Sequence, residues 1–176
     1  MKTTGAEAIV KFLLNEDVRY VFGLLGSPMM PIVDAIYRFP GIDFMPSQHE
    51  QGAIYMAEGY AKYTRAPAVS LVTIGPGATN AATGLAEAYL ESIPVIFMSM
   101  EGSTRLYSKS FCNAHEIDQM TMFRPITKAC LKIERADRVV EILERAFRTA
   151  MTGRKGPVYV GIARDILGQE VDIELR

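Results

Sequence analysis

The chain has 176 residues, of which 49% are hydrophobic, enough to bury the core of one ordinary globular domain. Its 19 basic and 20 acidic residues are scattered and give a net charge of −1, which argues against nucleic acid or a membrane surface as a partner. Two cysteines are too few for a disulfide framework and favour a reducing, cytoplasmic compartment.

The first half of the chain alternates helical and strand patterns. Apolar residues from Ala6 to Leu14 recur at helical spacing, and Thr4 with Glu7 three residues later forms a capping box, so a first helix is predicted there. Short apolar runs predict strands at 19–24, 42–46 and 68–74. Helices are predicted through 32–37, over 50–63, and after the turn at 75–77 to about residue 91.

The second half continues this alternation. The run from Ile93 to Met100 is so evenly apolar that both faces of its strand must be covered, as in a parallel sheet between layers of helices. Residues 101–118 show no period and predict a long loop, a feature that is often functional. An amphipathic helix over 139–150 and a strand over 157–162 follow.

These elements predict an α/β fold. We expect a single domain built on a doubly wound, mainly parallel sheet with helices on both faces. The domain is predicted to span residues 1–168, and residues 169–176 are predicted to begin a linker or tail.

Three strand-to-helix turns carry the candidate site, because ligands of open parallel sheets bind beyond the carboxyl ends of the strands. In one of them, Gly75 and Gly77 flank Pro76 and would let a ligand approach backbone amides at the start of a helix. Asn80 stands where a dinucleotide fingerprint needs Gly or Ala, and no Lys-Ser or Lys-Thr pair follows. A tight turn whose proline begins a helix is therefore an equally good interpretation.

Glu50 opens the helix that follows another of these turns. The next helical positions include Gly52, Ala53 and Ala57, small residues that leave room for a backbone or a flat ligand. A carboxylate at a helix N-terminus is ordinarily a surface partner of the helix dipole, whereas a buried one would be suited to proton transfer. His49 has no second histidine four residues later, so the zinc-protease pattern fails and no metal site is expected on this chain.

Seven motifs, taken together, resemble the N-terminal domain of acetolactate synthases and related thiamine diphosphate enzymes. They are Tyr20-Val-Phe-Gly23, Gln48-His-Glu-Gln-Gly-Ala53, Glu58-Gly-Tyr-Ala61, Gly75-Pro-Gly-Ala-Thr-Asn80, Ala88-Tyr-Leu-Glu-Ser-Ile-Pro94, Arg124-Pro-Ile-Thr-Lys128 and Gly156-Pro-Val158, in the same order and spacing as in the family. In that family this domain holds the aminopyrimidine ring of thiamine diphosphate, and the carboxylate that matches Glu50 hydrogen-bonds a ring nitrogen.

The resemblance implies a set of roles for the residues of the turns. Glu50 is implied to be catalytic, because a carboxyl group that shares a proton with the pyrimidine favours the imino form of the cofactor's own amino group, which then removes the thiazolium C2 proton. The implied cofactor-binding residues are Glu50, Gly26, Gly75, Pro76, Gly77 and Asn80.

The resemblance also implies what the chain needs from outside. In the family, the diphosphate and Mg²⁺ bind a separate domain marked by a Gly-Asp-Gly motif, and this sequence has no such motif. The chain is therefore expected to be the pyrimidine-binding half of a 2-oxo acid decarboxylase or carboligase, a lyase or transferase that is inactive without a diphosphate-binding domain of the same or a second chain. A fragment of a longer enzyme is favoured over one subunit of a split enzyme, and a homodimer or tetramer is expected, while a need for FAD is left open.

Departures from the family concern the substrate. Acetolactate synthases have Tyr-Pro-Gly-Gly where this chain has Leu24-Leu25-Gly26-Ser27, and the segment 111–123 is longer and lacks their Phe-Gln-Glu. The 2-oxo acid and its acceptor are therefore open, and Ser27, His115 and Glu116 are candidates for contact with the substrate.

Two other classes of function compete with this interpretation. The turn from Gly75 to Asn80, with Glu101 at the end of the next strand, would also suit a Rossmann-like nucleotide-binding module. A non-catalytic interaction domain would keep the same fold without the chemistry. The presence of Glu50 speaks against that last alternative, because a scaffold has no need for a carboxylate at this turn.

Overall fold

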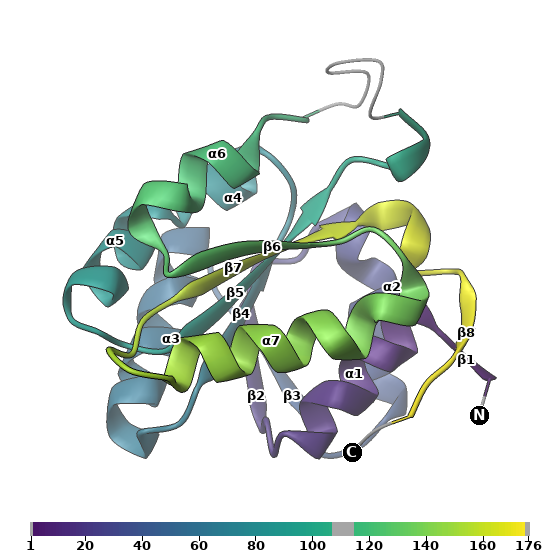
Figure 1. Cartoon of the computed structure of the whole chain (residues 1–176), viewed down its shortest axis with the longest axis horizontal. Coiled ribbons are helices and arrows are strands. Elements are labelled where there is room, and N and C mark those ends of the chain that lie inside the picture. The colour runs from purple at the N-terminus through teal and green to yellow at the C-terminus, as the bar shows by residue number, and fades with distance from the viewer. Residues whose placement is uncertain (1, 107–114, 175–176) are drawn as a thin grey trace.

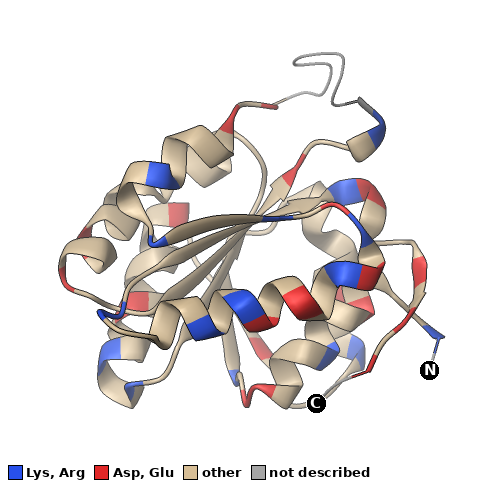
Figure 2. Cartoon of the chain, viewed as in Figure 1, with Lys and Arg blue, Asp and Glu red and all other residues tan. Residues whose placement is uncertain are grey.

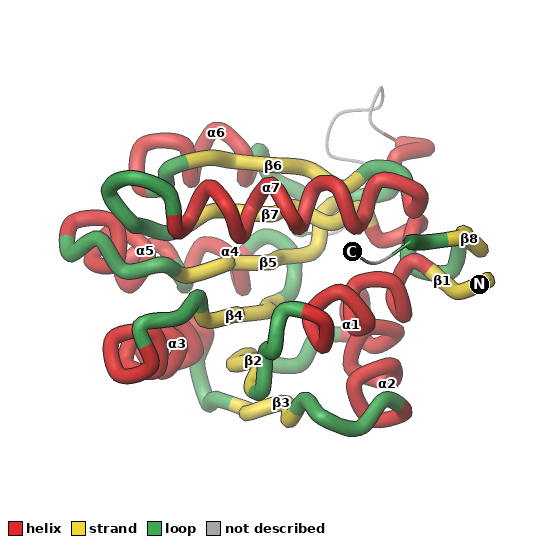
Figure 3. Tube along the Cα trace, turned by 60° about the horizontal axis from the view of Figure 1, so that its bottom comes forward, coloured by secondary structure: helices red, strands yellow, loops and turns green. Residues whose placement is uncertain are grey.

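The computed structural model of the chain describes residues 2–106 and 115–174 (Figure 1). Six strands form one sheet in the order β3-β2-β4-β5-β7-β6, and Figure 3 shows them stacked in this order. Their bounds are β2 (Tyr20–Gly23), β3 (Asp43–Pro46), β4 (Ala68–Val72), β5 (Val95–Glu101), β6 (Ala129–Ile133) and β7 (Val158–Ala163). All five strand pairings are parallel, so the predicted parallel α/β sheet is confirmed.

Helices cover both faces of this sheet (Figures 1 and 3). One face carries α1 (Gly5–Asn15), α2 (Met30–Arg38) and α7 (Val139–Met151), and the other carries α3 (Glu50–Thr64), α4 (Pro76–Asn80), α5 (Ala82–Leu90) and α6 (Gln119–Phe123). No helix among the described residues has both the length and the apolar character that a membrane crossing requires.

The evenly apolar sequence of β5 is explained by the burial of both faces of the strand. Successive side chains of a strand point to opposite faces, so Ile96 and Met98 enter the core beneath α1 and α7, whereas Phe97 enters the core beneath α5 and α6. On that second face the Phe97 ring meets the rings of Phe123 and Tyr159 at centroid distances of 5.2 and 5.7 Å. Both faces are buried, as the sequence predicts.

Several elements differ from the sequence-based expectation. The helix predicted from 75 to 91 is two helices, α4 and α5, separated at Ala81. The edge strand β6 and the short helix α6 were not predicted. Two further short strands, β1 (Lys2–Thr4) and β8 (Glu170–Asp172), pair antiparallel apart from the main sheet. The domain limit at residue 168 remains a prediction, and residues 107–114 of the predicted loop lie outside the described residues.

The predicted capping box at the start of α1 is confirmed. The Thr4 hydroxyl accepts from the Glu7 backbone nitrogen at 3.2 Å, and Glu7 Oε2 accepts from the Thr4 backbone nitrogen at 3.1 Å. Arg38, on the neighbouring helix α2, donates to Glu7 Oε1 at 2.8 Å. The Arg38 guanidinium, followed by the donors of Thr4 and Thr3, lowers the pKa of Glu7 from 4.5 to about 2.

Charged side chains elsewhere are mixed in sign. Figure 2 shows both acidic and basic residues along the outer face of α7, which agrees with a net charge of −1. One such pair joins Arg138 to Glu141 at 2.5 Å with both side chains largely exposed, and an exposed pair of this kind adds little stability. Glu7 differs because its side chain is only 17% exposed.

The variant Glu7→Gln isolates the charge, because glutamine can still accept from the Thr4 nitrogen. At pH 7 we expect it to lower the free energy of unfolding by about 1–2 kcal/mol, the scale of one hydrogen bond to a partly exposed charged group. The folded-state pKa lies below the ordinary value, so this stabilisation is complete above about pH 4.5 and is lost as the pH falls towards 2.

Urea unfolding of both proteins at pH 7, 5 and 4 measures the effect. Asp34→Asn is the control, because Asp34 binds the same guanidinium but is 63% exposed, and its effect should be smaller at every pH. A difference between wild type and Glu7→Gln that stays constant as the pH falls would contradict the assignment.

Candidate functional site

The sheet has a topological switch point between β2 and β4. The chain runs from β2 outward to β3 and then returns to the other side of β2 to form β4, so the connections that leave these two neighbouring strands go in opposite directions. Crevices at the carboxyl ends of such strand pairs are where open α/β sheets bind ligands. The candidate cofactor-binding residues and Ser27 follow β2, β3 or β4 and therefore lie at this edge of the sheet, whereas His115 and Glu116 follow β5.

The turns after β2 and β4 are in close contact. A Cβ atom placed on Gly26 would lie 2.5 Å from Cβ and 2.6 Å from Oγ1 of Thr73, distances that no side chain tolerates. Thr73 also faces Gly77, where a Cβ atom would lie 2.5 Å from its Cγ2. Glycine at both positions therefore lets the two turns close around Thr73.

Glu50 is buried at this edge, with 7% of its surface exposed. Asn80, at the end of α4, donates from Nδ2 to Glu50 Oε2 at 2.9 Å. The other oxygen, Oε1, faces Gly77, where a Cβ atom would lie only 3.0 Å away. The cap of helix α3 is His49, whose Nδ1 accepts from the Gln51 nitrogen at 3.2 Å. Of the two alternatives that the sequence left open for Glu50, the structure places it as a buried carboxyl.

The turn at Gly75 needs glycine for two reasons. Its φ is +64°, and a Cβ atom there would collide with the carbonyl oxygen of His115, which closes over the turn. Pro76 then begins α4, as predicted. The Gly75 nitrogen donates to Oε1 of Gln119 at 2.8 Å. The structure thus brings Gly75, Pro76, Gly77 and Asn80 together with Glu50, and their predicted roles stay predictions.

A cavity of about 380 Å³ lies beside Thr73 and Gly26, and neither Gly77 nor Glu50 lines it. Gly26, Ser27, Glu101, His115 and Arg164 are among the residues that line it. Two of the three predicted substrate residues, Ser27 and His115, therefore share one cavity. The third, Glu116, is half-buried beside His115 and is not among the lining residues.

Comparison with known proteins identifies the family. Residues 3–122 match the family model described as "Thiamine pyrophosphate enzyme, N-terminal TPP binding domain". The chain belongs to this family. The matched range includes every candidate site residue named above.

Individual relatives extend the likeness over nearly the whole chain. The acetolactate synthase isozyme 3 large subunit of Escherichia coli (strain K12) is 40% identical over 164 residues, which is 93% of this chain. The acetolactate synthase large subunit of Haemophilus influenzae is 41% identical over 165 residues, again 93% of this chain. The probable acetolactate synthase large subunit of Methanocaldococcus jannaschii is 39% identical over 170 residues, or 97% of this chain. The chain spans 28% of the length of each of these relatives.

A buried polar network adjoins the candidate site, and most of it was missed from the sequence. Glu101, only 5% exposed, accepts from the Tyr159 hydroxyl at 2.5 Å, and Tyr159 also contacts Ser99 and Gln119. Burial, followed by the charge of Glu101, raises the pKa of Tyr159 well above its ordinary value. The sequence signal that could have indicated this network was Glu101 on β5 together with Tyr159 on the neighbouring strand β7.

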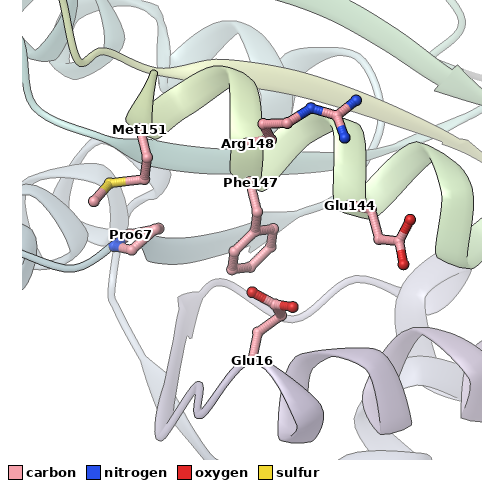
Figure 4. A pocket seen from close by; sticks show the side chains of 6 residues that line it. All are labelled: Glu16, Pro67, Glu144, Phe147, Arg148 and Met151. Carbon is pink, nitrogen blue, oxygen red and sulfur yellow. The ribbon is translucent and has the colours of Figure 1, made fainter. Parts of the chain in front are cut away.

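A second concavity, of about 430 Å³, lies at the opposite edge of the sheet from the candidate site. Pro67, which lines it, immediately precedes β4, whereas Thr73 of the site follows that strand. Figure 4 shows the Glu16 carboxylate directed towards the Phe147 ring and the Arg148 guanidinium directed away from it. This concavity is therefore separate from the candidate site.

One cluster of three glutamates among the described residues has carboxylate oxygens close enough together to suit a metal ion. Glu58, Glu87 and Glu91 place one carboxylate oxygen each within 4.8 Å of one another. The Lys62 ammonium lies 2.8 Å from Glu58 Oε1 and also pairs with Glu91. Glu58, followed by Glu91, raises the pKa of Lys62, so this lysine supplies the positive charge that the carboxylates require.

Substitution of Gly77 tests the close contact at the site. Gly77→Ala should destabilise the fold by about 1–3 kcal/mol, because the β-branched Thr73 has little freedom to move away from the added methyl group. Thermal melting measures this as a fall of about 2–4 °C for each kcal/mol.

The matched control is Gly59→Ala on helix α3, where a Cβ atom meets nothing within 4 Å. Alanine is the better helix former there, so this variant should melt at the wild-type temperature or above it. Equal melting temperatures for the two variants would show that Gly77 is not confined by Thr73 and Glu50.

Proposed function

We propose that this chain supplies the pyrimidine-binding half of a thiamine diphosphate-dependent enzyme that decarboxylates a 2-oxo acid or transfers the resulting carbon unit. In class terms the complete enzyme is a lyase or a transferase. The observation that carries the proposal is the buried Glu50 carboxyl, bonded to Asn80 and facing Gly77 at the switch-point edge of the sheet. The names of the relatives, acetolactate synthase large subunits, support the choice of a 2-oxo acid as substrate class.

The residues present fit an aminopyrimidine. Asn80 occupies one carboxyl oxygen of Glu50, and the other faces a glycine that adds no side chain, which leaves that oxygen for a ring nitrogen. Gly26 and the turn from Gly75 to Gly77 offer backbone at which a flat ring could lie close. When bound, thiamine diphosphate supplies the electron sink that decarboxylation of a 2-oxo acid requires.

Glu50 would then hold a proton between its carboxyl oxygen and the ring nitrogen. The Asn80 amide fixes the orientation of the carboxyl, and burial keeps bulk water from competing for that proton. Ser27 and His115 line the adjoining cavity, where the substrate would lie, together with Arg164, whose guanidinium is the donor type that suits a carboxylate. Glu116 stays a candidate only through its position beside His115.

The diphosphate and Mg²⁺ would be held by a diphosphate-binding domain of the same or a second chain. We propose a homodimer or tetramer in which the pyrimidine and diphosphate domains meet, with the cytoplasm as its compartment. A role for FAD is not part of the proposal.

The nucleotide-binding alternative is the weaker one. A glycine turn that cradles a phosphate presents free backbone N–H groups to it. Here the Gly75 N–H already donates to the buried Gln119 side chain, and Pro76 has no N–H to offer. Neither Gly75 nor Pro76 can therefore donate a backbone hydrogen bond to a phosphate at this turn.

The variant Glu50→Gln tests the proposal. Glutamine keeps the size and can still bond to Asn80, but it cannot exchange the proton shared with the ring nitrogen. In the complete enzyme, or in this chain combined with a diphosphate-binding domain, exchange of the cofactor C2 proton for deuterium should slow by about 10²–10⁴-fold at saturating thiamine diphosphate.

The matched control is Glu16→Gln, which removes a carboxylate from the opposite edge of the sheet (Figure 4) and should leave the exchange rate unchanged. Thermal melting of each variant separates loss of fold from loss of chemistry. Wild-type exchange in a folded, cofactor-saturated Glu50→Gln enzyme would mean that Glu50 is only a structural carboxyl.

A second expectation concerns the 176-residue chain by itself. It should bind thiamine diphosphate weakly or not at all, because the contacts to the diphosphate and Mg²⁺ belong to another domain. Isothermal titration calorimetry with and without Mg²⁺ measures this. Tight, Mg²⁺-dependent binding by the verified chain would place a diphosphate site within it and overturn this division of the cofactor.

A further inference from the structure

Gln119 is a fully buried amide at the start of helix α6. Its Oε1 accepts from the Gly75 backbone nitrogen at 2.8 Å, and its Nε2 donates to the Met100 carbonyl at 2.9 Å and to the Tyr159 hydroxyl at 3.2 Å. One side chain therefore joins the turn after β4 to strands β5 and β7. A primary amide is costly to bury unless its bonds are made, and here both of its ends have partners.

The orientation of this amide is fixed by the residues around it. Tyr159 donates its hydroxyl proton to Glu101 Oε1 at 2.5 Å, so its oxygen acts as an acceptor towards Gln119. The Met100 carbonyl can only accept. Both contacts therefore demand the NH₂ group of Gln119, and its carbonyl oxygen must face Gly75.

The Gly75 turn depends on an acceptor from outside itself. The Gly75 N–H is buried, and the side-chain oxygen of Gln119 is the acceptor that satisfies it. The φ of +64° is open to glycine but is not its only choice, so the turn is not held in this conformation by the backbone alone. Loss of the Gln119 bond would leave a buried N–H unpaired, which favours a rearrangement of the turn.

A rearrangement of this turn would reach Glu50. Gly77, two residues further on, faces Glu50 Oε1, and Asn80 of the same short helix α4 donates to Oε2. Both oxygens of the Glu50 carboxyl therefore have neighbours on the segment 75–80. Gln119 binds the first residue of this segment, Gly75.

We propose that Gln119 is a positioning residue for Glu50: its amide locks the Gly75 turn and thereby sets helix α4 against the Glu50 carboxyl. This positioning role rests on the proposed function, in which the Glu50 carboxyl must be correctly placed to meet a nitrogen of the aminopyrimidine ring. The geometry itself can be tested without the cofactor.

The test uses Gln119→Leu, which keeps the approximate size of the side chain and removes both the acceptor and the donor. Amide hydrogen exchange of the 176-residue chain, followed by NMR, should be at least about tenfold faster at Gly75, the factor that one lost hydrogen bond gives. The side-chain amide signals of Asn80 should shift as well, because that group reports on its bond to Glu50.

Thr127→Val is the matched control. Thr127 is also buried and its hydroxyl donates to the Phe123 carbonyl at the end of α6, so the variant loosens the same helix without touching Gly75. It should lower the melting temperature but leave the Gly75 exchange rate and the Asn80 signals at their wild-type values.

If Gln119→Leu does not fold, Tyr159→Phe takes its place, since it removes one of the two acceptors that orient the Gln119 amide. It also removes the hydroxyl contacts to Glu101 and Ser99, neither of which involves Gly75. A smaller increase in Gly75 exchange, in the same direction, is then expected. Wild-type exchange and unchanged Asn80 signals in a folded variant would overturn the proposal. So would the same changes in Thr127→Val, which would reduce Gln119 to a general contributor to stability.

The proposed function can fail separately. In the completed enzyme, Gln119→Leu should slow C2 proton exchange by about tenfold, less than Glu50→Gln, with little change in the KM for thiamine diphosphate. If Glu50→Gln has no effect on that exchange, the catalytic assignment falls, whereas the Gly75 and Asn80 measurements still decide whether Gln119 positions the turn.

Discussion

The close contact of the turns after β2 and β4 is the constraint on which the rest of the site depends. Thr73 is enclosed between Gly26 on one side and Gly77 on the other, at distances that leave no room for a Cβ atom. Because the strands are parallel neighbours at a switch point, this contact fixes the floor of the crevice. It separates two compartments: the Glu50 carboxyl on the Gly77 side, and the cavity lined by Ser27 and His115 on the Gly26 side.

Most of the sheet could be predicted because its signals are local. The evenly apolar β5, the small-residue helix α3 and the capping box at Thr4 each carry their pattern within a few residues. The parallel arrangement followed from the alternation of strands and helices. The edge strand β6 was not predicted because it is incompletely buried and its Lys132 interrupts an already short apolar run.

The candidate site also has features that the sequence could predict and features that it could not. Gly75, Gly77 and Glu50 could be found because turns after strands are where such sites lie, and the family motifs include them. The environment of Glu50 could not be predicted, since its neighbours Gly77 and Asn80 are distant in sequence, Asn80 by 30 residues. Gln119 was missed for a similar reason: it lies 44 residues from Gly75, in a segment without any period, and a glutamine by itself predicts nothing.

The two edges of the sheet bear on how molecules of this kind associate. The edge strand β3 is only four residues long and ends at Pro46, which has no N–H to offer a further strand. At the other edge, β6 carries Lys132, whose ammonium pairs with Glu101 and Glu134. A proline and a charge at the two margins disfavour growth of the sheet by added strands, a common route to aggregation. Any contact with another copy of the chain would therefore form more easily through helices and turns than by addition of a strand to either edge.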